Sequence, residues 1–282
     1  MSTRIAFCRV PDRSVLEGYA LPKNDWTTAV GEVGHGVVNV RGYPIAEIIE
    51  RLSYADAVFL TIRGELPSAS QRRLMDAALC SILEHGFYAP TTVAARVVAS
   101  ASPQSIIPGL TAGALTIGSI TVSPQHSAEL IAEVLRLTAA GQAADLAARE
   151  VAEGIVQRGE RMPGLGHPLH PEGDPRAEAL AAVARETGHW TQISESFMAV
   201  RDAYLDITER KLPVNIDGML GCVLSELGFR SVEMPGIAAI SFLPGVIAHC
   251  VEEITSPPTL RIAEGEYVGP PPRHLDRPRL SW

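Results

Sequence analysis

Helical periodicity limits the folds that this chain can adopt. From Pro44 onward apolar residues recur at steps of three to four positions, as Ile45, Ile48 and Leu52 do, and this pattern is typical of amphipathic helices. Strand signals after residue 43 are weak. A chain with about ten helical segments and almost no strand pattern is expected to fold as an all-α domain.

The expected elements begin and end at residues with known local preferences. Ser68 is suited to cap the start of a helix, and Gly64 to end the helix before it. The helix at about 104–118 carries almost no charge, so we expect it to be buried on all sides as the central core helix. The expected elements are a strand at 37–40, helices at about 44–52, 54–63, 69–84, 91–101, 104–118, 124–141, 143–158, 174–187, 192–211, 217–228 and 235–254, and an extended tail from residue 256.

Composition and charge argue against several classes of protein. The net charge is −8 and the basic residues are scattered, whereas a nucleic-acid-binding surface needs a basic patch. There is neither an uninterrupted apolar run of 18 residues nor a secretory signal pattern, so we expect no membrane span and a cytoplasmic protein. The four cysteines lack metal-ligand spacing, and no metal site is expected.

Three short segments each place a titratable side chain beside glycine, at what look like the ends of secondary-structure elements. They centre on His85, His167 and Asp217. Two imidazoles and a carboxyl group are the groups needed to move protons on and off oxygen and carbon. Because the three residues are far apart in sequence, only the fold can bring them together. We expect them to share one water-poor cleft.

Several motifs, in this order along the chain, resemble those of the citrate synthase superfamily. The chain length, Glu84-His85-Gly86 and Asp217-Gly218 are most similar to the citryl-CoA lyases of that superfamily. The motifs are RGYPIAE at 41–47, GELP at 64–67, AARVVAS at 94–100, GLGH at 164–167, DPR at 174–176, NIDG at 215–218, and IAH at 247–249 with Glu252.

The resemblance implies a fold and a set of partners. It implies a citrate synthase-like all-α fold with a large domain (1–122 and 225–282), a small domain (123–224) and an active site in the cleft between them. It also implies a homodimer or higher homo-oligomer without nucleic acid or membrane. No cofactor is expected to be bound permanently, because coenzyme A enters as a thioester substrate.

The implied reaction is reverse aldol cleavage of a citryl-CoA-like 3-hydroxyacyl-CoA, giving acetyl-CoA or another acyl-CoA and a 2-oxo acid such as oxaloacetate. By resemblance, His167 is the base at the hydroxyl, Asp217 the acid at carbon, and His85 a hydrogen-bonding partner of the substrate oxygen. Arg176 would hold a carboxylate. The coenzyme A contacts implied by the resemblance are Pro163, Gly164, Leu165 and Gly166.

The chain departs from the family pattern at three places. Segment 118–124 lacks the family's His-Gly-Gly or Gly-Gly sequence, which leaves the hydroxyls of Ser119 and Thr121 to bind an enolate oxygen. Pro168 and Phe242 stand where the family often has arginine. A lost arginine removes a charge-assisted pair worth about 1.5–3 kcal/mol. We therefore expect an acid half with one carboxylate fewer than citrate, or with an apolar substituent near Phe242.

Two further positions keep alternative interpretations. His249 lies on an apolar helix and is either a core histidine or a substrate contact. Arg273 or Arg277 could supply a replacement cation to a second subunit, or belong to a solvated basic tail.

Two other functions remain open. A condensing enzyme of the same fold would make a citrate-like or 2-alkylcitrate-like product, although the missing enol-stabilising histidine counts against it. A catalytically silent coenzyme A-binding homologue is the other alternative.

Overall fold

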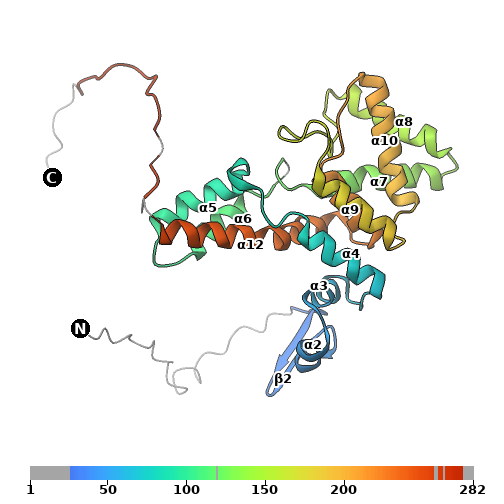
Figure 1. Cartoon of the computed structure of the whole chain (residues 1–282), viewed down its shortest axis with the longest axis horizontal. Helices are drawn as coiled ribbons and strands as arrows, with labels where there is room; N and C mark the ends of the chain where they lie inside the picture. Colours follow the sequence, from blue (N-terminus) through green and yellow to red (C-terminus); the bar gives the residue numbers. More distant parts are fainter. Residues whose placement is uncertain (1–25, 119, 257–259, 263, 276–282) are drawn as a thin grey trace. The chain divides into compact units, whose positions relative to one another are not determined.

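The computed structural model describes residues 26–118, 120–256, 260–262 and 264–275. The chain divides into two compact units, Met1–Arg51 and Leu52–Trp282 (Figure 1). Helices dominate the second unit, and the expected all-α fold class is confirmed. The division into large and small domains at residues 122 and 225 stays a prediction.

The first unit contains a small antiparallel sheet and one short helix. Strand β2 is the predicted strand at 37–40, and its neighbours were not predicted because β1 contains two glycines and β3 only two residues. Pro44 closes β3 instead of opening the helix. The elements are β1 (Gly31–Gly34), β2 (Val37–Val40), β3 (Tyr43–Pro44) and α2 (Ile45–Arg51).

The second unit is built from helices whose positions agree closely with the sequence pattern. Side-chain caps start several of them: Ser53 and Ser68 each form a capping box, and Gly64 ends α3 with φ 87°. The helices are α3 (Tyr54–Arg63), α4 (Ala69–Cys80), α5 (Pro90–Ala101), α6 (Ile107–Leu115), α7 (Pro124–Ala139), α8 (Ala144–Gln157), α9 (Pro175–Glu186), α10 (Gln192–Thr208), α11 (Ile216–Glu226) and α12 (Met234–Thr255), with short 3-10 turns η1 (Gly86–Tyr88) and η2 (Ser231–Glu233).

Helix α4 ends four residues earlier than predicted. The chain leaves the helix after Cys80, and the carbonyl of Leu83 then lies against Gly245 of α12, in space that a Cβ would fill. The residues between α4 and α5 therefore form a loop that carries His85. No helix or strand is assigned to the tail residues 260–262 and 264–275, as expected.

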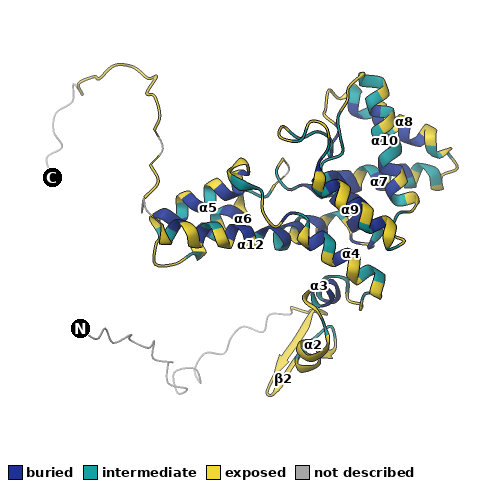
Figure 2. Cartoon of the chain, in the orientation of Figure 1, coloured by how far each residue is buried: buried dark blue, intermediate teal, exposed yellow. Residues whose placement is uncertain are grey.

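The prediction of a fully buried helix at 104–118 is wrong. In α6 only Gly109 and Gly113 are buried, whereas Ile107 is 58% and Leu115 81% exposed. A Cβ at Gly109 would lie 2.7 Å from the carbonyl oxygen of Ala95, so these glycines let α6 pack tightly on α5 while its large side chains face away. Figure 2 shows exposed positions along α5, α6 and the adjoining end of α12.

The helix buried on nearly all sides is α11. Eight of its eleven residues are buried, including Leu220, Val223 and Leu224. It packs against α7, α9 and α10. Among the described residues, one helical segment, Ser231–Thr255, is by length and composition apolar enough to cross a membrane, and 44% of its most apolar window is buried inside the protein.

Candidate active site

The loop after α4 holds His85 through the side chain before it. The Glu84 carboxylate accepts the backbone N–H of Gly86, at 2.7 and 2.8 Å from its two oxygens. Gly86 has φ 60°, a conformation that suits glycine. The turn fixes the backbone on both sides of His85, and the imidazole then points to the residues described next.

A contact between two glycines fixes the loop of His167 against the start of α11. The N–H of Asn215 donates to Gly164 O (2.9 Å), and its side-chain amide donates to Gly166 O (2.9 Å). Gly164 has φ 79°, and a Cβ there would lie 2.6 Å from the Cα of Gly218. Asp217 is the second residue of α11, so this close approach also fixes the carboxyl group relative to His167.

The predicted catalytic residues line one cavity of about 370 Å³. His85, His167 and Asp217 contribute to its lining, so the expected gathering of two imidazoles and a carboxyl group is found. Of the predicted substrate contacts, Arg176, Thr121 and Phe242 also line it. The remaining lining residues are Ile82, Tyr88, Ala89, Pro90, Ile120, Val122, Gly166, Pro168, Asn215 and Ile216.

Hydrogen bonds restrict where the imidazole protons lie. Arg176 Nη1 lies 3.2 Å from His85 Nδ1, and a guanidinium can only donate, so His85 carries its proton on Nε2. The backbone N–H of Leu169 lies 3.1 Å from His167 Nδ1 and also can only donate. The two Nε2 atoms are 3.1 Å apart.

These three contacts cannot all be hydrogen bonds while both rings are neutral. If His167 accepts from Leu169, both Nε2 atoms carry hydrogen and face each other. If His167 accepts from His85, its Nδ1–H opposes the N–H of Leu169. The contacts that link Arg176, the two imidazoles and the Leu169 N–H therefore contain one hydrogen-bond acceptor too few. A substrate oxygen within hydrogen-bond distance of both Nε2 atoms would supply it.

The surroundings keep both imidazoles neutral. Burial lowers the pKa of His85, and the positive charge of Arg176 lowers it further. Burial also lowers the pKa of His167, followed by the effects of His170, stacked at 4.7 Å between ring centroids, and of Arg176. Neutral rings can accept or donate a proton, which acid–base chemistry needs.

Asp174 positions Arg176, and sequence analysis did not assign it a role in the site. Its carboxylate is 0% exposed and accepts from Arg176 Nε (3.0 Å) and Nη2 (2.8 Å). It also accepts the N–H of Ile216 at 3.0 Å and so joins the starts of α9 and α11. The available signal was Asp before Pro at a helix start, which predicts a cap only.

The environment of Asp217 favours the protonated form of its carboxyl group. Burial raises the pKa of Asp217, although the backbone N–H of Ser123 and the charge of Arg176 oppose this shift. A protonated carboxyl in a closed site can deliver a proton to carbon.

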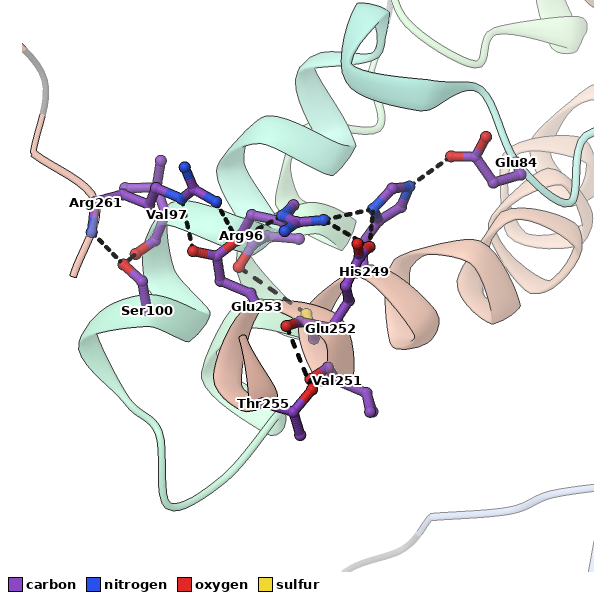
Figure 3. A network of polar contacts seen from close by, with 12 residues as sticks. Glu84, Arg96, Val97, Ser100, His249, Val251, Glu252, Glu253, Thr255 and Arg261 are labelled. Carbon is purple, nitrogen blue, oxygen red and sulfur yellow. Dashed lines mark hydrogen bonds and ion pairs between the residues drawn. The ribbon is translucent and has the colours of Figure 1, made fainter. Parts of the chain in front are cut away.

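His249 lies outside the cavity lining, in a network of charged side chains between α5 and α12 (Figure 3). Arg96 Nη1 lies 3.2 Å from His249 Nδ1, and His249 Nε2 lies 2.7 Å from the Glu84 carboxylate. Both ring nitrogens thus have protein partners. Of the two interpretations of His249, this placement favours the structural one.

Other predicted site residues also lie away from the cavity. Arg273 lines a separate hollow of the tail with Tyr267 and residues 270–272. Gly164 is buried against α11 instead of facing a hollow, and Pro163 lines neither hollow of this site. Ser119 and Arg277 lie outside the described residues.

A second hollow of about 460 Å³ adjoins the cavity at His167 and contains basic residues that sequence analysis missed. Arg161, Arg210 and Lys211 line it together with the predicted Leu165 and Gly166. In the part of the chain that the structure describes, no ion pair is recorded for these three cations. Their separation in sequence hid them, because only the approach of two loops makes them neighbours.

The residues that the structure describes contain no group of three or more His, Cys, Asp or Glu side chains arranged to hold a metal ion.

Comparison with known proteins identifies the family. The model of the citrate synthase C-terminal domain matches residues 52–263, and the chain belongs to the citrate synthase family. Citrate synthase 2 of Bacillus subtilis is 28% identical over 82% of this chain, which spans 60% of that relative.

Two solved structures extend the comparison. Citryl-CoA lyase from Hydrogenobacter thermophilus has a TM-score of 0.80 and 28% identity, over 89% of this chain and 98% of that one. The ATP citrate lyase of Methanothrix soehngenii, in complex with citrate and coenzyme A, has a TM-score of 0.68 and 18% identity, over 89% of this chain and 43% of that one. The second likeness supports the fold alone.

Proposed function

We propose that this protein is a carbon–carbon lyase that cleaves a citryl-CoA-like 3-hydroxyacyl-CoA into an acyl-CoA and a 2-oxo acid. The observation that carries the proposal is the single cavity shared by His85, His167 and Asp217. The likeness to a citryl-CoA lyase over 98% of that chain supports the direction of the reaction.

The reaction needs one base and one acid. His167 Nε2 takes the proton of the C3 hydroxyl, and C3 becomes the carbonyl carbon of the 2-oxo acid. The bond between C2 and C3 breaks, and its electron pair forms the enolate of the thioester. The Asp217 carboxyl then delivers its proton to C2, which becomes the methyl of acetyl-CoA. Proton exchange with water resets both groups.

Hydrogen bonding explains why His167 is the better base. The Nδ1 of His85 faces the permanent charge of Arg176, so its ring remains an Nε2–H donor. The Nδ1 of His167 faces only the backbone N–H of Leu169, a residue that is 55% exposed and can turn to water. His167 can therefore present a free lone pair at Nε2, while His85 donates to the same substrate oxygen.

The enolate oxygen needs a donor as well. Thr121 lines the cavity, and its hydroxyl is the proposed donor. Tyr88 also lines the cavity, with its ring 5.7 Å from that of His167, and its phenol is a second candidate. A neutral hydroxyl stabilises an enolate less than an imidazole would.

The second hollow is suited to coenzyme A. Arg161, Arg210 and Lys211 would bind its phosphates, because guanidinium and ammonium groups are the usual partners of phosphate. Leu165 and Gly166 would contact the pantetheine arm on its way to His167. This arrangement leads the thioester from the basic hollow into the cavity.

A homo-oligomer is part of the proposal. Large apolar side chains are exposed on α5, α6 and α12, three helices that contact one another, and exposed apolar surface of this kind is typical of a protein interface. Arg273 of a second copy remains a candidate for substrate binding. The exposed apolar residues are Val93, Val97, Ile107, Leu115, Ile247 and Val251.

The alternative activity is condensation by a citrate synthase-like enzyme. The relative in Bacillus subtilis is a citrate synthase, and this likeness keeps the alternative in view. A synthase must also hydrolyse the thioester, so it releases free coenzyme A. A silent coenzyme A-binding homologue would release neither product.

The products distinguish these functions. The protein is incubated with citryl-CoA and, separately, with acetyl-CoA plus oxaloacetate, and the coenzyme A species are separated by chromatography. A lyase yields acetyl-CoA from citryl-CoA without free coenzyme A. Free coenzyme A from acetyl-CoA plus oxaloacetate would indicate a synthase instead. Thermal stabilisation by coenzyme A without turnover would indicate the silent homologue.

A further inference from the structure

The charge of the cavity does not suit a substrate with two free carboxylates. Among the lining residues that the structure describes, Arg176 is the only arginine or lysine, and Asp217 is the only carboxyl group. The two imidazoles add no positive charge, because burial and Arg176 keep them neutral. The cavity thus receives one cation from its own chain.

Some of the N–H groups of Arg176 already donate to protein acceptors. Asp174, which is fully buried, accepts from Nε and Nη2 of Arg176, and His85 accepts from Nη1. One edge of the guanidinium is therefore occupied, and the pair of Arg176 and Asp174 is neutral overall. A first substrate carboxylate can reach the remaining N–H groups. A second one would lose its water without gaining a cation, which is strongly unfavourable.

Apolar side chains form much of the remaining wall. Phe242, Ile82 and Ala89 all line the cavity and are 3%, 3% and 4% exposed. Such a wall stabilises an alkyl group and disfavours a charged one. The wall and the single cation point to the same kind of substrate.

We infer that the acid half of the substrate carries one carboxylate, bound by Arg176, and an alkyl substituent that packs against Phe242. This inference rests on the proposed lyase function. The substrate class is a 3-carboxy-3-hydroxyacyl-CoA whose third substituent at C3 is a methyl or short alkyl group. Lysis breaks the bond between C2 and C3 and gives an acyl-CoA and a 2-oxo monocarboxylic acid, with the hydroxyl proton passing to His167 and the proton of Asp217 to C2.

Two thioesters that differ at one group test the inference. Citryl-CoA carries a carboxymethyl group at C3, and 3-carboxy-3-hydroxybutanoyl-CoA carries a methyl group there. We expect the protein to cleave the methyl compound with at least tenfold higher kcat/KM. Equal rates, or a preference for citryl-CoA, would overturn the inference while leaving the lyase function intact.

A binding measurement keeps the inference testable if neither thioester is cleaved. Thermal unfolding is followed with coenzyme A plus pyruvate and with coenzyme A plus oxaloacetate. We expect the larger rise in Tm with pyruvate, whether or not the protein is catalytic. A larger rise with oxaloacetate would contradict the inference, and a missing turnover would contradict only the proposed function.

Substitution of the apolar wall gives a second test. Phe242→Arg adds a cation beside the cavity and should move the kcat/KM ratio at least tenfold toward citryl-CoA. Phe242→Leu, the matched control, adds no charge and should keep the preference for the methyl compound. An unchanged ratio in a folded Phe242→Arg protein would show that this wall does not select the substituent. If Phe242→Arg does not fold, the comparison of the two thioesters with the natural protein still decides.

Discussion

Two places in the second unit contain the same arrangement, in which a buried carboxylate holds an arginine that contacts a histidine. They differ in what the other nitrogen of that histidine contacts. In the cavity, the buried carboxylate of Asp174 holds Arg176, whose Nη1 lies 3.2 Å from Nδ1 of His85. Between α5 and α12, the buried carboxylate of Glu253 holds Arg96, whose Nη1 lies 3.2 Å from Nδ1 of His249. We call these the cavity triad and the α5–α12 triad.

The difference lies at the far nitrogen of each histidine. In the α5–α12 triad, His249 Nε2 donates to the Glu84 carboxylate at 2.7 Å, so both ring nitrogens of His249 have protein partners (Figure 3). In the cavity triad, His85 Nε2 meets another imidazole, His167, and the set lacks an acceptor. A carboxylate, a guanidinium and an imidazole thus stabilise the fold in one place and leave a donor for a ligand in the other.

The largest expected effect on kcat comes from Asp217, whose carboxyl group lines the same cavity as His85 and Arg176 of the cavity triad. Asp217→Asn keeps the shape but removes the acid, so kcat should fall by about two to four powers of ten. The rate of acyl-CoA formation measures this. Asp206→Asn on the exposed face of α10 makes the same chemical change and should leave kcat unaltered. A fall of less than threefold in Asp217→Asn would remove Asp217 from the mechanism.

A matched pair of substitutions compares the two triads directly. Asp174→Asn and Glu253→Gln each neutralise a fully buried carboxylate that pairs with arginine, so each should lower the free energy of unfolding by about 3 kcal/mol. Denaturant unfolding measures this loss. Only Asp174→Asn should also lower kcat/KM, by about tenfold, because it releases Arg176.

The comparison would fail if both substitutions reduced the activity of the folded protein equally. Measuring kcat/KM well below the unfolding transition separates lost activity from lost folded protein.

The smallest expected effect is a shift in pH dependence. Lysis needs neutral His167, so kcat/KM falls as the pH drops through the pKa of that imidazole. This pKa lies below the usual 6.5, because burial, His170 and Arg176 lower it. Arg176→Gln removes one of these causes, so the acid limb should move to higher pH by about one unit or less. Arg96→Gln, its counterpart in the α5–α12 triad, should leave the limb in place.

Sequence patterns predicted the helices because amphipathic periodicity and caps act locally. The helices predicted at 124–141 and 192–211 are found at Pro124–Ala139 and Gln192–Thr208. The burial of α6 could not be predicted in this way. Its lack of charge shows that the helix is apolar, but does not show that Gly109 and Gly113 form the packed face.

Some parts of the site could likewise be predicted from the sequence, and others could not. Glycines beside His85, His167 and Asp217 indicated tight turns at titratable groups, and these residues do line one cavity. Asp174 was less visible, because its contact with Ile216 joins residues 42 positions apart. The basic hollow around Arg161 and Arg210 has no local signal either, since it exists only where two loops meet.

The central claim is that His167 and Asp217 move protons at one bound thioester. Lysis carried out in D₂O tests it directly, because Asp217 exchanges its proton with solvent before delivering it to carbon. Mass spectrometry of the product acetyl-CoA should show one deuterium in the methyl group for each bond cleaved, and Asp217→Asn should lose this product almost entirely. Acetyl-CoA formed by Asp217→Asn at the natural rate, or formed by the natural protein without deuterium, would contradict the account.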